Sequence, residues 1–183
     1  TGFGSNLISN ANFEDGTTNG WFTWNGTITA DTLNPHNGSY ALKLGNRNGN
    51  GPVAYSLKSL VKPGSKYAVK LWASIAAATS PNVNITTKIG CADSNTYSWL
   101  VSPVTINNLQ WVELSGELNV PQCELTDLLI YAEGPAGGID IYLDHVSVRE
   151  VVTANLVGNG DFEQGNVNGW SSWNGTVAAT TEL

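Results

Sequence analysis

Two short segments of the sequence each place an aromatic residue two positions before a second side chain that could contact a ligand. In "NTYSWLV", Tyr97 and Trp99 are two residues apart, and in "LLIYAEG" Tyr131 is two residues before Glu133. Residues two apart on a strand share a face at a distance of roughly 6.6–7 Å, so the first pair would form a flat strip. That strip matches the apolar face of a pyranose ring, and nearby amides, hydroxyls and carboxylates can satisfy sugar hydroxyls. The alternative is that Tyr97 and Trp99 belong to the core.

A second aromatic pattern occurs twice: "NGWFTWNGT" at 19–27 and "NGWSSWNGT" at 168–176. Residues three apart on a strand point to opposite faces. We therefore expect Trp21 to anchor the core and Trp24 to be an exposed platform. Trp170 and Trp173 occupy the same positions in the second copy.

The second copy also predicts the domain organisation. Residues 6–32 and 155–181 align without gaps, with 15 of 27 positions identical and a period of 149 residues. This period fits a whole domain and is too long for a solenoid repeat. We predict one complete module at 1–152, then a linker and the truncated start of a homologous module at 153–183.

Composition excludes some classes of partner. The chain has 8 Lys and Arg against 15 Asp and Glu, for a net charge of −7. Phosphate binding needs clustered basic residues, so we expect neither nucleic acid nor an anionic membrane as partner. No apolar run approaches the roughly 18 residues that would span a bilayer.

The remaining sequence predicts an antiparallel β-sandwich. Short alternating segments such as "KYAVKLWAS" and "DLLIYAEGP" are separated by Gly, Pro and Asn, and no segment has a convincing helical period. In the second of these, Leu128, Ile130 and Ala132 would face the core. Cys91 and Cys123 form either a disulfide or two separate buried thiols, which spacing cannot decide.

Five segments in order resemble the carbohydrate-binding modules of families 4, 9, 16 and 22. They are "NLISNANFEDGTTNGW", "HNGSYALKLG", "LVKPGSKYAVKLWA", "QWVELSGELNVP" and "LLIYAEGPAGGIDIYLDHVSV". The resemblance, closest to families 16 and 22, covers essentially all of 6–150. It implies a galactose-binding-like jelly roll that binds polysaccharide without catalysis, as an appendage of a secreted, extracellular glycoside hydrolase. The aromatic count favours a β-glucan or a glucomannan, and the repeat implies a tandem sister module.

The resemblance also implies site residues. Family 16 pairs a tryptophan with an aromatic residue at positions that match Trp24 and Tyr131, and its polar contacts fall on Trp99 and at or near Thr86. Family 22 uses a carboxylate and an aromatic residue that match Glu133 and Tyr97. Family 22 also tends to carry a tryptophan in the segment "RNGNGP", where this chain has Asn48 and Asn50. That departure weakens an assignment to xylan.

Modules of this group commonly hold a structural calcium ion away from the groove. The residues that match its ligands are Glu14, Asp144, Asn12, Asn37 and Ser39. Ca²⁺ takes several oxygen ligands at about 2.3–2.6 Å. The alternative is that Glu14 is a turn residue and that Asp144 pairs with a basic side chain.

The sequence leaves two other functions open. A glycoside hydrolase would need two facing carboxylates about 5–9.5 Å apart, for which Glu133 with Glu113 or Glu117 are the candidates. His36 and His145 have neither triad nor zinc spacing. A structural or adhesion sandwich of a cell-surface protein would use the aromatics as core or inter-module contacts and would bind no glycan.

Overall fold

The computed structural model describes residues 1–153 and 161–181. Residues 3–151 form one compact unit of two antiparallel sheets, and the described part of the chain contains no helix. No helix among these residues could therefore cross a membrane. The prediction of an antiparallel β-sandwich is confirmed.

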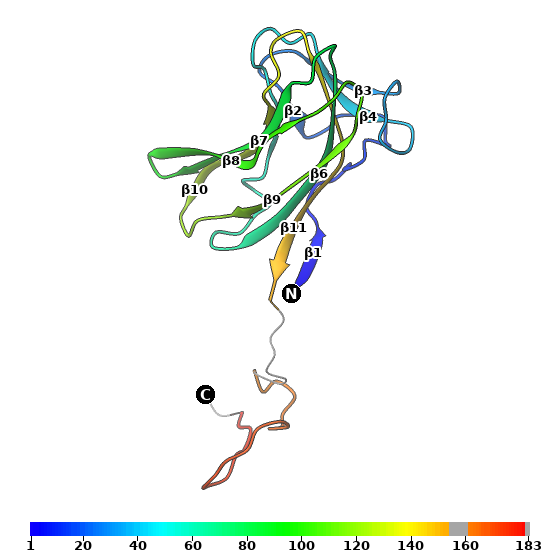
Figure 1. Cartoon of the computed structure of the whole chain (residues 1–183). Helices are drawn as coiled ribbons and strands as arrows, with labels where there is room; N and C mark the ends of the chain where they lie inside the picture. Colours follow the sequence, from blue (N-terminus) through cyan, green and yellow to red (C-terminus); the bar gives the residue numbers. More distant parts are fainter. Residues whose placement is uncertain (154–160, 182–183) are drawn as a thin grey trace. The chain divides into compact units, whose positions relative to one another are not determined.

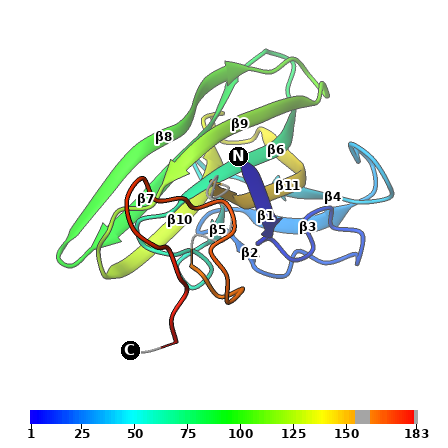
Figure 2. The same cartoon turned by 90° about the horizontal axis from the view of Figure 1, so that it is seen from below.

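The first sheet has the order β3-β4-β11-β6-β9, with β1 paired to β11. The second has the order β2-β5-β10-β7-β8. Figure 2 shows β8, β7 and β10 running side by side. The first sheet comprises β1 (Gly2–Asn6), β3 (Thr27–Asp31), β4 (Ala41–Gly45), β6 (Lys66–Ala76), β9 (Val112–Asn119) and β11 (Asp140–Val152). The second comprises β2 (Trp21–Phe22), β5 (Val53–Ser56), β7 (Asn82–Cys91), β8 (Ser94–Thr105) and β10 (Leu125–Glu133).

Alternation along β10 divides its side chains between the core and the outer face, as the sequence predicts. Leu128, Ile130 and Ala132 belong to the main core. Leu129 and Tyr131 form a separate small cluster with Ala54 of β5. The period of two on a strand produces this division, and the second face becomes the floor of the site described below.

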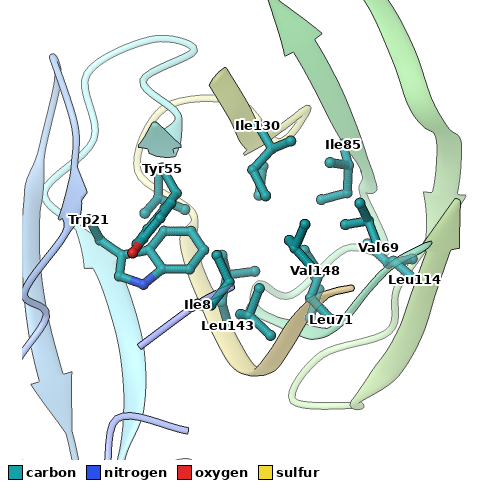
Figure 3. Packing of buried hydrophobic residues seen from close by; sticks show 14 of the residues in the cluster. Ile8, Trp21, Tyr55, Val69, Leu71, Ile85, Leu114, Ile130, Leu143 and Val148 are labelled. Carbon is teal, nitrogen blue, oxygen red and sulfur yellow. The ribbon is translucent and has the colours of Figure 1, made fainter. Parts of the chain in front are cut away.

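The core lies between the two sheets (Figure 3). Trp21 is only 6% exposed and meets the ring of Tyr55 edge-on, with centroids 5.0 Å apart. The ring of Phe13 also contacts Trp21, with centroids 5.9 Å apart. The prediction that Trp21 anchors the core is confirmed.

Cys91 and Cys123 form a disulfide with Cα atoms 5.9 Å apart. The bond joins the end of β7 to the segment between β9 and β10. Of the two possibilities left open by the sequence, the disulfide is the one observed.

Residues 161–181 form turns and bends, with no strand among the described residues of this segment. Phe162 and Trp170 contact each other with centroids 5.4 Å apart. The interpretation of 153–183 as a linker and the start of a second module stays a prediction, and its residues 154–160 and 182–183 lie outside the described residues.

Candidate functional site

Strand register in the second sheet brings five of the predicted residues together. On β10, Tyr131 is directly opposite Thr86 of β7, and Thr86 is directly opposite Trp99 of β8. Tyr97 is opposite Lys88 and Glu133 is opposite Asn84, one step along the same face in each direction. Three neighbouring strands of the sheet thus present one continuous row of side chains.

These side chains surround a hollow of about 360 Å³. Its lining residues are Thr86, Tyr97, Ser98, Trp99, Tyr131 and Glu133. Tyr97 and Trp99 are 60% and 63% exposed, so the alternative that they belong to the core is wrong. Five of the six predicted binding residues therefore line one open site.

Trp24, the sixth, stands beside this hollow. Its ring meets the ring of Tyr131 edge-on, with centroids 5.6 Å apart and planes at 74°. Trp24 is 59% exposed whereas Tyr131 is 8% exposed. The predicted pair is therefore formed, with Trp24 as the accessible ring and Tyr131 as its support.

A chain of hydrogen bonds holds the polar centre of the site. Asn84 Nδ2 donates to Thr86 Oγ1 at 3.0 Å, and Thr86 Oγ1 donates to Glu133 Oε1 at 2.6 Å. Asn84 and Thr86 are both buried. The second oxygen of Glu133 stays available as an acceptor at the hollow. Asn84 alternates with Thr86 in "NVNITT", and this pattern is the signal that could have added it to the site.

Burial raises the pKa of Tyr131, and the charge of Glu133 and the phenol of Tyr97 act in the same direction. The Tyr131 hydroxyl therefore stays protonated at neutral pH and above. A neutral phenol offers both a donor and an acceptor to a hydroxylated ligand.

Sequence reasoning missed Arg47, which fixes two loops near Glu133. Its guanidinium is buried and donates to the carbonyls of Gly51, Pro135, Ala136 and Ile139 at 2.7–3.0 Å. Burial lowers the pKa of Arg47, an effect opposed by Asp140 and Glu133. An isolated arginine in "GNRNGN" gives no sign of this role, because its acceptors lie up to 92 residues away.

The predicted metal ligands gather around the segment 36–40. Glu14 accepts hydrogen bonds from the backbone of Ser39 and Tyr40, at 2.9–3.0 Å. Asp144 is completely buried and accepts from the backbone of His36 and Asn37 at 3.1 and 3.4 Å. Asn12 caps the backbone of Glu14 at 3.4 Å.

Burial raises the pKa of the Asp144 carboxyl, against the opposing effect of its hydrogen bonds and of His145. Among the described residues, the ion pair that this carboxylate forms is with His145, at 4.0 Å, and not with a lysine or an arginine. The alternative pairing of Asp144 with Lys or Arg is not formed. Two carboxylates, one from the segment between β1 and β2 and one from β11, thus contact the same loop, and carboxylate oxygens are ligands that suit a hard cation.

The carboxylates that the sequence offers as candidates for hydrolysis lie on different sheets. Glu113 and Glu117 lie on β9 in the first sheet, where they pair with Lys70 and Lys66 at 3.7 and 3.2 Å. Glu133 lies on β10 in the second sheet.

Comparison with known proteins agrees with this geometry. The family model described as "Carbohydrate binding domain" (CBM_4_9) matches residues 5–138. Endo-1,4-beta-xylanase A of Thermoanaerobacterium saccharolyticum is 30% identical over 155 residues, which are 83% of this chain and 13% of that enzyme. The chain therefore spans a small part of this curated relative.

Two solved structures share the fold. The CBM22-1 xylan-binding domain from Paenibacillus barcinonensis Xyn10C superposes with a TM-score of 0.74 at 22% identity, over 84% of this chain and 99% of that one. The CBM22-1-CBM22-2 tandem domain of the same protein has a TM-score of 0.74 at 21% identity, over 91% of this chain and 50% of that one. With the family model matching most of the sequence, the chain belongs to the carbohydrate binding domain family and is a non-catalytic binding module.

Proposed function

We propose that the outer face of the second sheet binds a β-1,4-linked xylan chain. The observation that carries the proposal is the open hollow in which Tyr97, Trp99 and Trp24 offer exposed rings around the Thr86–Glu133 hydrogen bond. Rings can stack on sugar faces while the carboxylate accepts from sugar hydroxyls. The names of a xylanase relative and of a xylan-binding domain with the same fold support this choice of polymer.

In the sequence, Asn48 and Asn50 weaken an assignment to xylan. Trp24 nevertheless offers an aromatic platform at this end of the site. Asn25, next to Trp24, accepts from the backbone of Asn48 at 3.0 Å. The loop 48–50 and the segment that carries Trp24 are thereby held together. Trp24 can supply the ring that a tryptophan of the 48–50 loop would otherwise provide.

Calorimetric titration with xylohexaose, cellohexaose and mannohexaose tests the proposal. We expect xylohexaose to bind at least tenfold more tightly than the other two. Tighter binding of cellohexaose or mannohexaose would instead support the β-glucan or glucomannan predicted from the aromatic count. No binding of any of the three would leave the adhesion sandwich as the better account.

We also propose that the module belongs to a longer secreted glycoside hydrolase, which it targets to its substrate. Its match to only 13% of the length of a xylanase supports this. The fold similarity to half of a tandem structure supports a sister module in the same chain. Mass spectrometry of the full-length natural protein recovered from culture medium would test both statements. It would show whether the protein is secreted and whether it contains a hydrolase and a sister module.

A structural calcium ion held by Glu14 and Asp144, with oxygen atoms of Asn12, Asn37 and Ser39, completes the proposal. The ion would neutralise two carboxylates that hold one loop and would join this loop to β11. We expect EDTA to lower the melting temperature, and added Ca²⁺ to restore it, without a change in xylohexaose affinity. An unchanged melting temperature would exclude the ion.

A further inference from the structure

His36, Asp144 and His145 form a cluster that the glycan site does not use. One ligand atom from each lies within 4.8 Å of the other two. His36 comes from the segment between β3 and β4, whereas Asp144 and His145 come from β11 of the first sheet. These are the only two histidines in the whole chain, and the fold brings them together although they are 109 positions apart.

Both imidazoles present a buried nitrogen that lacks a hydrogen-bond partner in the described structure. These atoms are His36 Nδ1 and His145 Nε2. Buried polar atoms are nearly always paired, so an unpaired one indicates a bound water or ion. Here both imidazoles lie beside one buried carboxylate, and His145 Nε2 is 4.0 Å from Asp144 Oδ1.

The surrounding residues fix the orientation of the cluster. The His36 ring stacks on Trp72 of β6, with centroids 4.1 Å apart and planes at 18°, and meets Trp111 edge-on at 5.4 Å. His145 has a φ of +48°, and the register of β11 against β6 shifts between Asp144 and Ser147. This bulge re-aims side chains, and it places the rings of His145 and His36 edge-to-face at 5.4 Å.

Asp144 retains acceptor capacity for a third partner. Its Oδ1 accepts one backbone N–H, from His145 at 2.7 Å, while Oδ2 accepts from His36 and Asn37. A carboxylate has about four acceptor positions. One position on Oδ1 is therefore still open.

We propose that His36, Asp144 and His145 bind a zinc ion. Two imidazoles and one carboxylate are ligands that Zn²⁺ prefers, whereas Ca²⁺ takes oxygen ligands. With metal–ligand distances of about 2.0–2.2 Å, ligand atoms of a tetrahedral site lie roughly 3.3 Å apart. The three side chains reach that spacing by shifts of about 1 Å, and water supplies the fourth ligand.

This site differs from the calcium set, which uses Glu14 and the oxygen atoms of Asn12, Asn37 and Ser39. The two sets share only Asp144. One carboxylate cannot serve both ions fully, so Zn²⁺ and Ca²⁺ compete. Either ion would join the segment around residue 36 to β11.

The test uses the whole 183-residue chain after removal of metal with a chelator. Calorimetric titration with ZnCl₂ should give one equivalent of tight binding. Titration with Co²⁺ should give the strong visible absorption of four-coordinate cobalt. Failure of the unmodified protein to bind Zn²⁺ would overturn the proposal.

Two variants remove one imidazole each and keep the local structure. His36→Phe retains the stacking on Trp72, and His145→Asn retains a residue that tolerates positive φ. We expect each to weaken Zn²⁺ binding by about tenfold or more and to lose the cobalt absorption. If both variants keep the Zn²⁺ affinity of the unmodified protein, with the fold verified by near-UV circular dichroism, the ion binds elsewhere.

Glu14→Gln is the matched control, because Glu14 belongs only to the calcium set. It should leave the Zn²⁺ affinity within about twofold of the unmodified protein. Loss of Zn²⁺ binding in Glu14→Gln, with binding retained in His36→Phe and His145→Asn, would assign the ion to the oxygen ligands and contradict the proposal.

Discussion

The two copies of the duplicated segment have the same local geometry and different burial. Phe13 and Phe162 both have a φ near +60°, and Gly26 and Gly175 have φ values of +115° and +117°. Phe13 contacts Trp21 at 5.9 Å, and Phe162 contacts Trp170 at 5.4 Å. Yet Trp21 is 6% exposed and Trp170 is 45% exposed.

The comparison shows that the local sequence determines the turn geometry, whereas burial of the tryptophan depends on the neighbouring strands. Turn residues and neighbouring aromatics set the local backbone in both copies, because glycine and short polar side chains favour these turns. Burial of the first tryptophan requires Tyr55 of β5, which the described part of residues 161–181 does not supply. The same contrast holds for the second tryptophan, since Trp24 contacts Tyr131 and Trp173 is fully exposed.

Truncation of the first tryptophan should give the largest difference between the copies. We expect Trp21→Ala to lower the free energy of unfolding by about 3–5 kcal/mol, because it opens a cavity between Phe13 and Tyr55. Trp170→Ala should change it by less than about 0.5 kcal/mol. Guanidinium denaturation followed by circular dichroism measures both, and equal effects would contradict the burial difference.

Truncation of the second tryptophan should affect binding instead of stability. We expect Trp24→Ala to weaken xylohexaose binding by about 2 kcal/mol, which is roughly 30-fold. Trp173→Ala should leave the affinity of this chain unchanged. Calorimetry measures both affinities, and unaltered binding in Trp24→Ala would remove that residue from the site.

A smaller effect is expected at the polar centre. Glu133→Gln keeps the shape and still accepts from Thr86, but it loses the charge that strengthens hydrogen bonds. We expect binding to weaken by about 1 kcal/mol, or roughly fivefold. Glu113→Gln on the other sheet is the control, and a loss of affinity there would show that the site is misplaced.

Much of the fold could be predicted from sequence because strand alternation is a local property. The division of β10 into core residues and outer residues followed from the period of two, as did the opposite roles of Trp21 and Trp24. For Tyr97 and Trp99 the same alternation left two answers. It identifies which residues share a face, but not which face is covered by the other sheet.

The rest of the site depends on contacts between distant segments. Arg47 is buried because carbonyls of 135–139 surround it, and nothing local signals this. The two histidines have no recognisable motif spacing, and a bulge in β11 brings them together. Pairing of Cys91 with Cys123 likewise needed the geometry of the folded chain.

The indole N–H signals of the seven tryptophans offer the most direct test of the central claim, that a xylan chain lies on the outer face of the second sheet. Titration of ¹⁵N-labelled protein with xylohexaose, followed by NMR, should shift the signals of Trp24 and Trp99. The signals of Trp21, Trp72 and Trp111 should stay in place. Shifts confined to Trp72 and Trp111, or no shifts at saturating xylohexaose, would contradict the account.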